Sequence, residues 1–331
     1  MSAQANHHQY RHHSVFMRVS MLAALGLPIS ACSTLTSTTS TASLAPEIER
    51  PTVALVLGGG GAKGFAHVGV IKALEEQGIT PTLIVGTSVG SLVGSLYASG
   101  YTPTQLEQLA LTTTDSELTD FVLSNQGFIE GIKLKNFINN KVGGRAIEDF
   151  PIRFAAVAAE KHTLTKAVIT TGDAGLAVQA SCSIPNIFIA PRIPEKVGKK
   201  YIDGGVVSLV PVDSARDLGA DIVIAVDVTV TNIKSSTPAT NKIPTLNSLS
   251  SFWGFLENST AAQPSTNRTA SIRYERDRAD IVITPDVGHI SSIDTRQRRA
   301  LITAGTQATT PQIAAIKQLI KQKSESKYAT L

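Results

Sequence analysis

The stretch "TLIVGTSVGSLVGSLYASG", residues 82–100, joins two different hydrophobic patterns across a short turn that contains glycine. Residues 82–86 form a short apolar run with β-branched members, which predicts a buried strand. From residue 88 onward the apolar side chains recur at helical spacing, and the pattern stops at Gly100, which predicts a helix. A buried strand followed at once by a helix is the repeating unit of an α/β fold.

Ser88 lies in the turn of this unit, and a glycine stands two residues away on either side. Because Gly86 and Gly90 lack side chains, the strand and the helix can close sharply around the serine and hold its hydroxyl at the carboxyl end of the strand. The backbone amide of Val89 is then an expected oxyanion donor. The residues alone leave two interpretations open, a tight turn without chemistry and a turn that presents a nucleophile.

A second glycine-rich turn, "GGGGAKG" at residues 58–64, follows the apolar run 52–57 and opens another helical pattern. Backbone amides at such a junction bind an anion. A dinucleotide site needs an acidic residue at the end of the second strand, and a nucleotide P-loop needs Ser or Thr after the lysine; both are missing. The third candidate anion is the oxyanion of an ester under attack, bound by the amides of Gly59, Gly60 and Gly61.

The motif "IDGG", residues 202–205, places Asp203 at the end of a predicted strand. An Asp-Gly pair is a common turn, so a purely structural role is open as well. Open α/β sheets bind ligands at the carboxyl ends of their strands, where Ser88 is also expected. A carboxylate beside the hydroxyl can act as its base if burial raises its pKa above the reference value of about 3.9. Asp227 also ends a strand, and we interpret it as structural.

The rest of the chain continues the alternation of strands and helices. This order predicts a largely parallel sheet covered by helices on both faces. Strands are expected at 152–160, 167–173, 200–205, 221–228 and 279–287, and helices at 62–78, 102–112, 173–184, 212–219, 249–262 and 311–322. Residues 231–247 have little periodicity and are expected to form a loop. Phe252, Trp253, Phe255 and Leu256 are expected on the apolar face of a core helix.

The N-terminus resembles an export signal. Arg11 and Arg18 precede an apolar stretch that ends in "ISAC", residues 29–32, which resembles the lipobox of bacterial lipoproteins, and Met17 is an alternative start. We therefore expect residues 1–31 to be a signal peptide and Cys32 to carry lipid. The small polar residues of 32–49 predict a flexible tether before a single domain at 50–325. The expected location is the bacterial cell envelope, at the outer membrane and facing the periplasm.

The composition narrows the classes of function. The chain has 331 residues, of which 42% are hydrophobic and 17% charged, and a formal net charge of +4, so it is an ordinary globular protein and not a nucleic-acid binder by charge. With Cys32 acylated, Cys182 has no disulfide partner, and we expect it to be a small buried residue. No metal-ligand spacing is present, and no cofactor is expected.

The blocks "GGGGAKG", "GTSVG" and "DGG", in that order, resemble the patatin-like phospholipase family, and the runs "ASCSIPNIF" and "DGGVVSLVPVDSARDLGADIVIAVDV" resemble its bacterial members. The resemblance implies a three-layer α/β/α fold, Ser88 as nucleophile, Asp203 as its base, an oxyanion hole at Gly59–Gly61, and membrane lipids or other fatty acyl esters as substrates. The motif glycines are Gly59, Gly61, Gly64, Gly86, Gly90, Gly204 and Gly205. Many relatives carry Asn shortly after the third block, where this chain has Ser208 and Leu209.

Two other functions remain open at this point. The order Ser88, Asp203, His289 is that of an α/β-hydrolase triad. A lipoprotein that binds lipid without catalysis is the second alternative.

Overall fold

The central sheet is made of strands whose side chains are buried on both faces. The computed structural model describes residues 50–230 and 274–329 of the chain. In that part the sheet has eight strands, paired in the order β5-β6-β3-β2-β1-β7-β8, with β4 also paired to β3. The strands are β1 (Val53–Leu57), β2 (Leu83–Thr87), β3 (Arg153–Glu160), β4 (Lys166–Ile169), β5 (Arg192–Ile193), β6 (Lys199–Asp203), β7 (Ile222–Val226) and β8 (Ile281–Ile283).

The five strands β3, β2, β1, β7 and β8 are parallel, whereas β4 and β6 run antiparallel to β3. The predicted, largely parallel sheet is therefore confirmed. The helices are α1 (Phe65–Glu76), α2 (Val89–Ala98), α3 (Pro103–Thr112), α4 (Asp115–Leu118), α5 (Ile132–Lys141), α6 (Ala174–Ser181), α7 (Val212–Asp217), α10 (Arg298–Thr309) and α11 (Ile313–Ala329). Short 3₁₀ helices are η1 (Gly61–Gly64), η2 (Ile147–Asp149), η3 (Gly204–Val206), η4 (Thr295–Gln297) and η5 (Thr310–Gln312).

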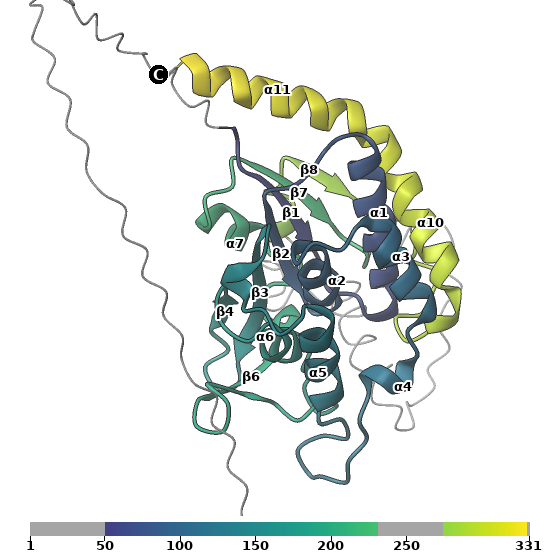
Figure 1. Cartoon of the computed structure of the whole chain (residues 1–331), viewed down its shortest axis with the longest axis vertical. Helices are drawn as coiled ribbons and strands as arrows, with labels where there is room; N and C mark the ends of the chain where they lie inside the picture. The colour runs from purple at the N-terminus through teal and green to yellow at the C-terminus, as the bar shows by residue number, and fades with distance from the viewer. Residues whose placement is uncertain (1–49, 231–273, 330–331) are drawn as a thin grey trace, which may run out of the picture. The chain divides into compact units, whose positions relative to one another are not determined.

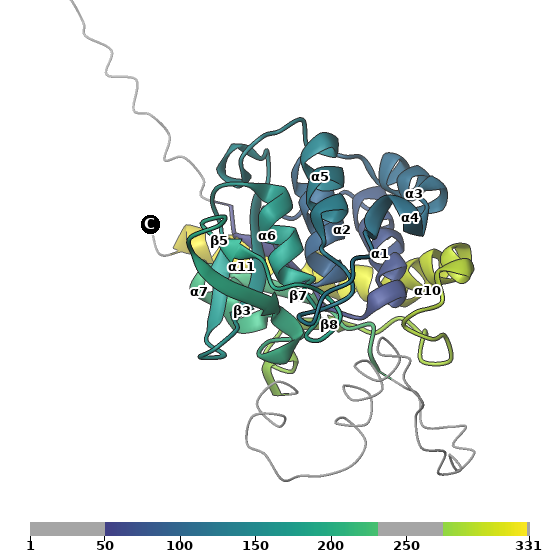
Figure 2. The ribbon, with the colours of Figure 1, turned by 90° about the horizontal axis from the view of Figure 1, so that it is seen from below.

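Alternate side chains of the central strands enter two separate cores. Leu55, Ile84 and Ile224 pack in the larger core with α1, α2, α5, α6, α10 and α11. Val56 and Val85, which point the other way, pack in a smaller core with α7 and the segment before it. Figures 1 and 2 show α2, α5 and α6 grouped on one side of the strands. Helices thus flank both faces of the sheet, which confirms the predicted three layers.

Strands β2 and β6 pair with the same edge of β3, one after the other along its length. Val157 of β3 lies opposite Thr87, the last residue of β2, and opposite Val168 of β4. The next residue, Ala158, lies opposite Asp203, the last residue of β6, and again opposite β4. Because β4 occupies one edge at both positions, β2 and β6 share the other edge, and their carboxyl ends meet. The turns that follow β2 and β6 are therefore neighbours.

Helix α10 packs closely on α1 because both helices present glycine at the crossing. A Cβ atom at Gly69 would lie 1.8 Å from the carbonyl oxygen of Ile302, and one at Gly305 would lie 2.0 Å from the carbonyl oxygen of Ala66. The hydroxyl of Thr306 donates to the carbonyl of Gly69 at 3.1 Å. This contact fixes α1, which begins directly after the glycine-rich turn.

The structure adds elements that the pattern analysis did not predict, namely α4, α5, α10 and β5. The predicted helix at 311–322 is confirmed as part of α11. The predicted loop at 231–247, the predicted helix at 249–262, and the signal and tether at 1–49 lie outside the described residues. None of the described helices combines the length and the apolar character needed to cross a bilayer.

Candidate active site

Ser88 occupies a strained turn between β2 and α2. Its backbone has φ of 54° and ψ of −127°, a conformation that residues with a side chain rarely adopt. A Cβ atom at Gly86 would lie 2.5 Å from the backbone of Gly90, and one at Gly90 would lie 2.0 Å from the carbonyl oxygen of Leu57. The two glycines thus permit the tight strand-to-helix turn that the sequence predicts, and the turn holds Ser88 at the carboxyl end of β2.

Asp203 ends β6 on the shared edge of β3, next to the turn that holds Ser88. Its backbone amide donates to the carbonyl of Ser183 at 2.8 Å, and its Oδ1 accepts a hydrogen bond from the amide of Gly205 at 2.7 Å. Gly204 follows closely under β3, because a Cβ atom there would lie 2.2 Å from the carbonyl oxygen of Val157. Only 1% of Asp203 is exposed, so its carboxyl group is enclosed by protein.

Burial raises the pKa of Asp203 to about 6, although interactions with the Ser88 side chain and with the Gly205 amide each lower it. The other carboxylate oxygen, Oδ2, makes no hydrogen bond of standard length and angle to the described residues. Among the described residues no hydrogen bond of standard geometry joins the Ser88 hydroxyl to this carboxyl group. Catalytic hydrogen bonds are often long or poorly aligned before substrate binds. A carboxylate with a pKa near 6 is ionised at neutral pH and basic enough to accept a proton.

The glycine-rich turn lies directly against Ser88. A Cβ atom at Gly59 would lie 3.4 Å from the Cβ of Ser88. The amide of Gly59, however, donates to the carbonyl of Leu209 at 3.0 Å, so the prediction that it is an oxyanion donor is wrong. The amides of Gly60, Gly61 and Val89 donate to no other residue that the structure describes. These three amides are the remaining candidates for an oxyanion hole.

Ser181, which the sequence analysis missed, supports the nucleophile turn. It lies at the end of α6, accepts a hydrogen bond from the Ser88 amide at 2.9 Å and donates to the carbonyl of Val157 at 2.6 Å. The Ser88 amide is therefore not an oxyanion donor. No local pattern distinguishes Ser181 from the neighbouring small residues, so only tertiary contact reveals this role.

A buried acid supports the loop that follows Asp203. The hydroxyl of Ser208 donates to Glu275 at 2.8 Å, while the carbonyl of Ser208 accepts from the hydroxyl of Thr87 at 2.9 Å. The Ser208 amide donates to Gly204 at 2.8 Å. Burial raises the pKa of Glu275, partly offset by the Ser208 bond and by Lys166. Ser208 thus ties the loops after β2 and β6 together.

His67 and Cys182 lie near the site without the properties of catalytic groups. His67 is fully buried in α1 and donates from Nε2 to the carbonyl of Gly58 at 2.8 Å, and burial lowers its pKa to about 4. The imidazole ring of His67 is therefore neutral, and its hydrogen bond to Gly58 holds the start of the glycine-rich turn in place. Cys182 is a free, buried thiol, as the sequence predicted. Burial and, to a lesser degree, the Asp203 charge raise its pKa, so the thiol stays protonated.

His289 is exposed in the loop after β8, and among the described residues it makes no hydrogen bond to Ser88 or Asp203. The pKa of Asp203 is set by burial, by the Ser88 side chain and by the Gly205 amide. Asp227 accepts hydrogen bonds from Thr229 at 2.8 and 2.6 Å and from Arg276 at 2.9 Å, which supports its structural interpretation. The described residues contain no cluster of His, Cys, Asp or Glu that could hold a metal ion.

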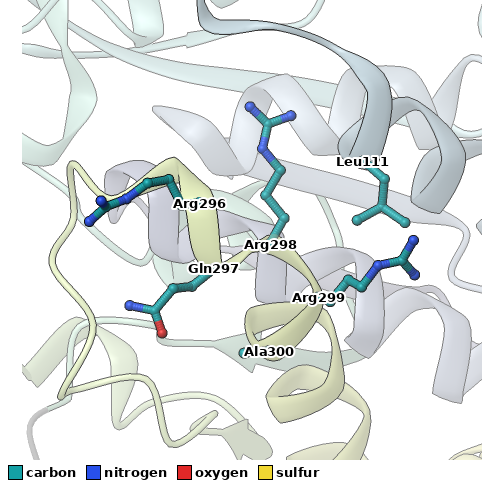
Figure 3. A pocket seen from close by; sticks show the side chains of 6 residues that line it. All are labelled: Leu111, Arg296, Gln297, Arg298, Arg299 and Ala300. Atoms are coloured by element: carbon teal, nitrogen blue, oxygen red, sulfur yellow. The ribbon is translucent and has the colours of Figure 1, made fainter.

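A separate hollow lies at the start of α10 (Figure 3). It is lined by Leu111, Arg296, Gln297, Arg298, Arg299 and Ala300. Arg298 is engaged with protein, since it donates to the carbonyl of Ala110 at 2.9 Å and to the carboxylate of Asp115 at 3.0 Å. Figure 3 shows the guanidinium groups of Arg296, Arg298 and Arg299 pointing in different directions. They do not converge on one ligand, and the hollow contains neither Ser88 nor Asp203.

Comparison with known proteins indicates which family this chain resembles. Residues 55–216 match the family model described as patatin-like phospholipase. Human patatin-like phospholipase domain-containing protein 6 is 34% identical over 183 residues, which cover 54% of this chain and 13% of that protein. An uncharacterised NTE family protein of Mycobacterium tuberculosis is 36% identical over 184 residues, which cover 54% of this chain and 49% of that protein. The chain thus spans less than half the length of each relative.

A solved structure shows the same fold at low sequence identity. The crystal structure of VipD from Legionella pneumophila superposes with a TM-score of 0.54 at 13% identity, covering 83% of this chain and 67% of that chain. At this identity the likeness concerns the fold alone. The chain thus has the fold of a patatin-like domain, and its residues 55–216 are similar to the patatin-like phospholipase family.

Proposed function

We propose that this chain is a lipid acyl hydrolase that cleaves fatty acyl esters through Ser88 and Asp203. The observation that carries the proposal is the meeting of β2 and β6 on consecutive residues of β3, which juxtaposes a strained serine and a buried carboxyl group. The match of residues 55–216 to the patatin-like phospholipase model supports ester hydrolysis in general. Phospholipids, lysophospholipids and simpler fatty acyl esters all fit this chemistry.

In the first half of the proposed cycle, the Asp203 carboxylate accepts the proton of the Ser88 hydroxyl as Oγ bonds to the ester carbonyl carbon. The carbonyl oxygen becomes an oxyanion, which the amides of Gly60, Gly61 and Val89 stabilise. When the tetrahedral intermediate collapses, the bond to the alcohol oxygen breaks and that oxygen takes the proton from Asp203. The alcohol leaves, and the acyl group remains on Ser88.

In the second half, the same carboxylate activates water. Asp203 accepts a proton from the water as its oxygen attacks the acyl carbon, and the same amides bind the new oxyanion. The bond to Ser88 then breaks, Oγ recovers the proton from Asp203, and the fatty acid is released. One carboxylate thus serves both halves, and no imidazole is needed.

The test is mass spectrometry of the products that the protein forms from mixed bacterial membrane lipids. We expect free fatty acids from the wild type and none above background from Ser88→Ala. Ser95→Ala is the matched control, because among the described residues this buried hydroxyl of α2 bonds only to the carbonyl of Leu92 in its own helix, at 2.9 Å. Lipid binding without fatty acid release by the wild type would contradict the proposal and favour the non-catalytic alternative.

We also propose that the chain is exported and anchored by lipid on Cys32. The support is the "ISAC" sequence after an apolar stretch that is too short to span a bilayer. Cells fed radiolabelled palmitate should label the wild type and not Cys32→Ser. Equal labelling of both proteins, or of neither, would contradict the anchor without bearing on Ser88.

A further inference from the structure

Two neighbouring hairpins expose side chains that a soluble surface normally avoids. We define the apolar hairpin as residues 121–129 and the lysine hairpin as residues 192–200. Phe121 is 79% exposed, Leu123 is fully exposed and Phe128 is 50% exposed, while Val197 at the tip of the lysine hairpin is 83% exposed. Clustered exposed side chains of this size mark an interaction surface.

The apolar hairpin is an ordered part of the fold. Phe121 bridges Ile129, and the Val122 amide donates to the Phe128 carbonyl at 2.9 Å. Asp120 closes the base of the hairpin by accepting from the amide of Gly131 at 2.7 Å. Figure 1 shows the loop between α4 and α5, which contains this hairpin, projecting from the lower end of the fold.

The lysine hairpin lies beside the apolar hairpin and supplies positive charge. The Lys200 ammonium donates to the Gln126 side chain at 2.9 Å, which joins the two hairpins. Residues 192–200 contain four basic residues and one acidic residue, a net charge of +3, whereas residues 121–129 contain no charged residue. Lys196 and Lys199 are exposed. The combined surface is apolar at its tips and basic beside them.

Both hairpins lead directly to the candidate active site. The amides of Phe128 and Ile129 donate to the Ile187 carbonyl at 2.8 and 2.9 Å, in the segment that continues from α6 and Ser183. In the lysine hairpin, β6 begins at Lys199 and ends at Asp203, a distance of about 13 Å along the strand. A partner bound to these hairpins is therefore held close to the reacting groups.

We propose that the two hairpins form a docking surface for an anionic phospholipid bilayer. Such a bilayer offers an apolar interior for the phenylalanine and leucine side chains and anionic head groups for the lysines in one continuous surface. A second copy of the chain would present the same positively charged lysine hairpin. Its charge would therefore repel this surface, whereas anionic head groups are attracted to it. The proposal rests on the proposed function, because it explains how lipid substrate is brought to Ser88.

The test uses the full chain with Ser88→Ala, so that no lipid is consumed, and with Cys32→Ser, so that no acyl chain anchors it. An environment-sensitive dye on Leu123→Cys reports insertion of the apolar hairpin, and the same dye on Glu76→Cys, an exposed position at the end of α1, is the control. With vesicles of phosphatidylcholine and phosphatidylglycerol, we expect increased emission and quenching by nitroxide-labelled acyl chains only at residue 123. The same response at both positions, or none at residue 123, would overturn the proposal.

Charge removal provides the second readout with the dye at residue 123. Lys196→Gln with Lys199→Gln should raise the vesicle concentration for half-maximal response about fivefold for each charge removed. Lys321→Gln with Lys323→Gln, two exposed lysines of α11, should leave this concentration unchanged. An equal effect of the two pairs would contradict a local basic surface, and urea midpoints within error would show that all variants are folded.

Two further outcomes have a defined meaning. A dye response that depends on protein concentration in the absence of vesicles would assign the surface to a second copy and overturn the bilayer proposal. Because the test protein lacks the Ser88 hydroxyl, failure of hydrolysis in the wild type would refute the proposed function and leave the docking result standing. Failure of docking in the presence of normal hydrolysis would refute only this inference.

Discussion

Replacing Asp203 with Asn should stabilise the protein at pH 8 while removing its base. Burial raises the pKa of the carboxyl group from 3.8 to about 6, so the folded state holds the proton more tightly than the unfolded state does. Above pH 6 the carboxylate is ionised in both states, and its burial is a full cost to folding. Asn has nearly the same shape and carries no charge.

The cost of burying the ionised carboxylate follows from the rise of its pKa from 3.8 to about 6. At pH 8 this rise corresponds to about 3 kcal/mol of the free energy of unfolding. Asn keeps an oxygen that can accept from the Gly205 amide, a contact of 2.7 Å in Asp203. Its NH₂ group replaces Oδ2, which has no partner among the described residues, at a cost of about 1 kcal/mol. The variant should therefore be more stable than the wild type by about 2 kcal/mol.

Urea denaturation of both proteins as a function of pH is the assay. As the pH falls below 6, the folded protein takes up a proton on Asp203, and the ionic cost to the stability of the wild type decreases. This cost disappears well below pH 3.8, where the carboxyl group is protonated in both states. The advantage of Asp203→Asn should vanish near about pH 4.5, where the remaining ionic cost equals that of the amide. An Asn variant that is less stable at pH 8, or a difference that does not change with pH, would refute a buried, ionised Asp203.

Three further substitutions test the supports of the site. Gly305→Ala places a Cβ 2.0 Å from a carbonyl of α1, so the free energy of unfolding from urea titration should drop by about 3 kcal/mol, and an unchanged value would contradict the close crossing. Ser181→Ala leaves the Ser88 amide without its acceptor, so kcat for a soluble ester should fall by about tenfold with KM little changed. A rise in KM alone would instead assign Ser181 to substrate binding. Ser208→Ala removes a hydrogen-bond donor to buried Glu275 and should destabilise the fold by about 1–3 kcal/mol at pH 8. Adding Glu275→Gln should restore part of this loss of stability. An unchanged stability of the double variant would argue against the Ser208–Glu275 bond as the cause.

Much of the fold follows from local patterns, because the central strands are short buried runs bounded by glycine. Helix α10 could not be predicted in this way, because its sequence "RRALITAGTQAT" combines small and polar side chains and buries few large ones. It is held instead by the glycine crossing with α1, a contact between residues more than 200 positions apart. The antiparallel direction of β6 was likewise not predictable, since it depends on its pairing with β3 and not on its own residues.

The candidate site could be predicted in part for the same reason. Ser88 lies in a turn that its flanking glycines specify, so the turn was visible in the sequence. The use of the Gly59 amide by Leu209 and the support of Ser88 by Ser181 are tertiary hydrogen bonds that no local motif encodes. Ser208 lies shortly after the third motif, but its bond to Glu275 crosses 67 residues of chain and is likewise not encoded locally.

The most direct test of the central claim is a fluorophosphonate reaction followed by peptide mass spectrometry at pH 8. We predict a covalent adduct on Ser88 in the wild type and in His289→Ala, formed at similar rates, and a rate at least about a hundredfold lower in Asp203→Asn. An adduct on a different residue, or a loss in His289→Ala as large as that in Asp203→Asn, would contradict a hydroxyl activated by the carboxylate alone.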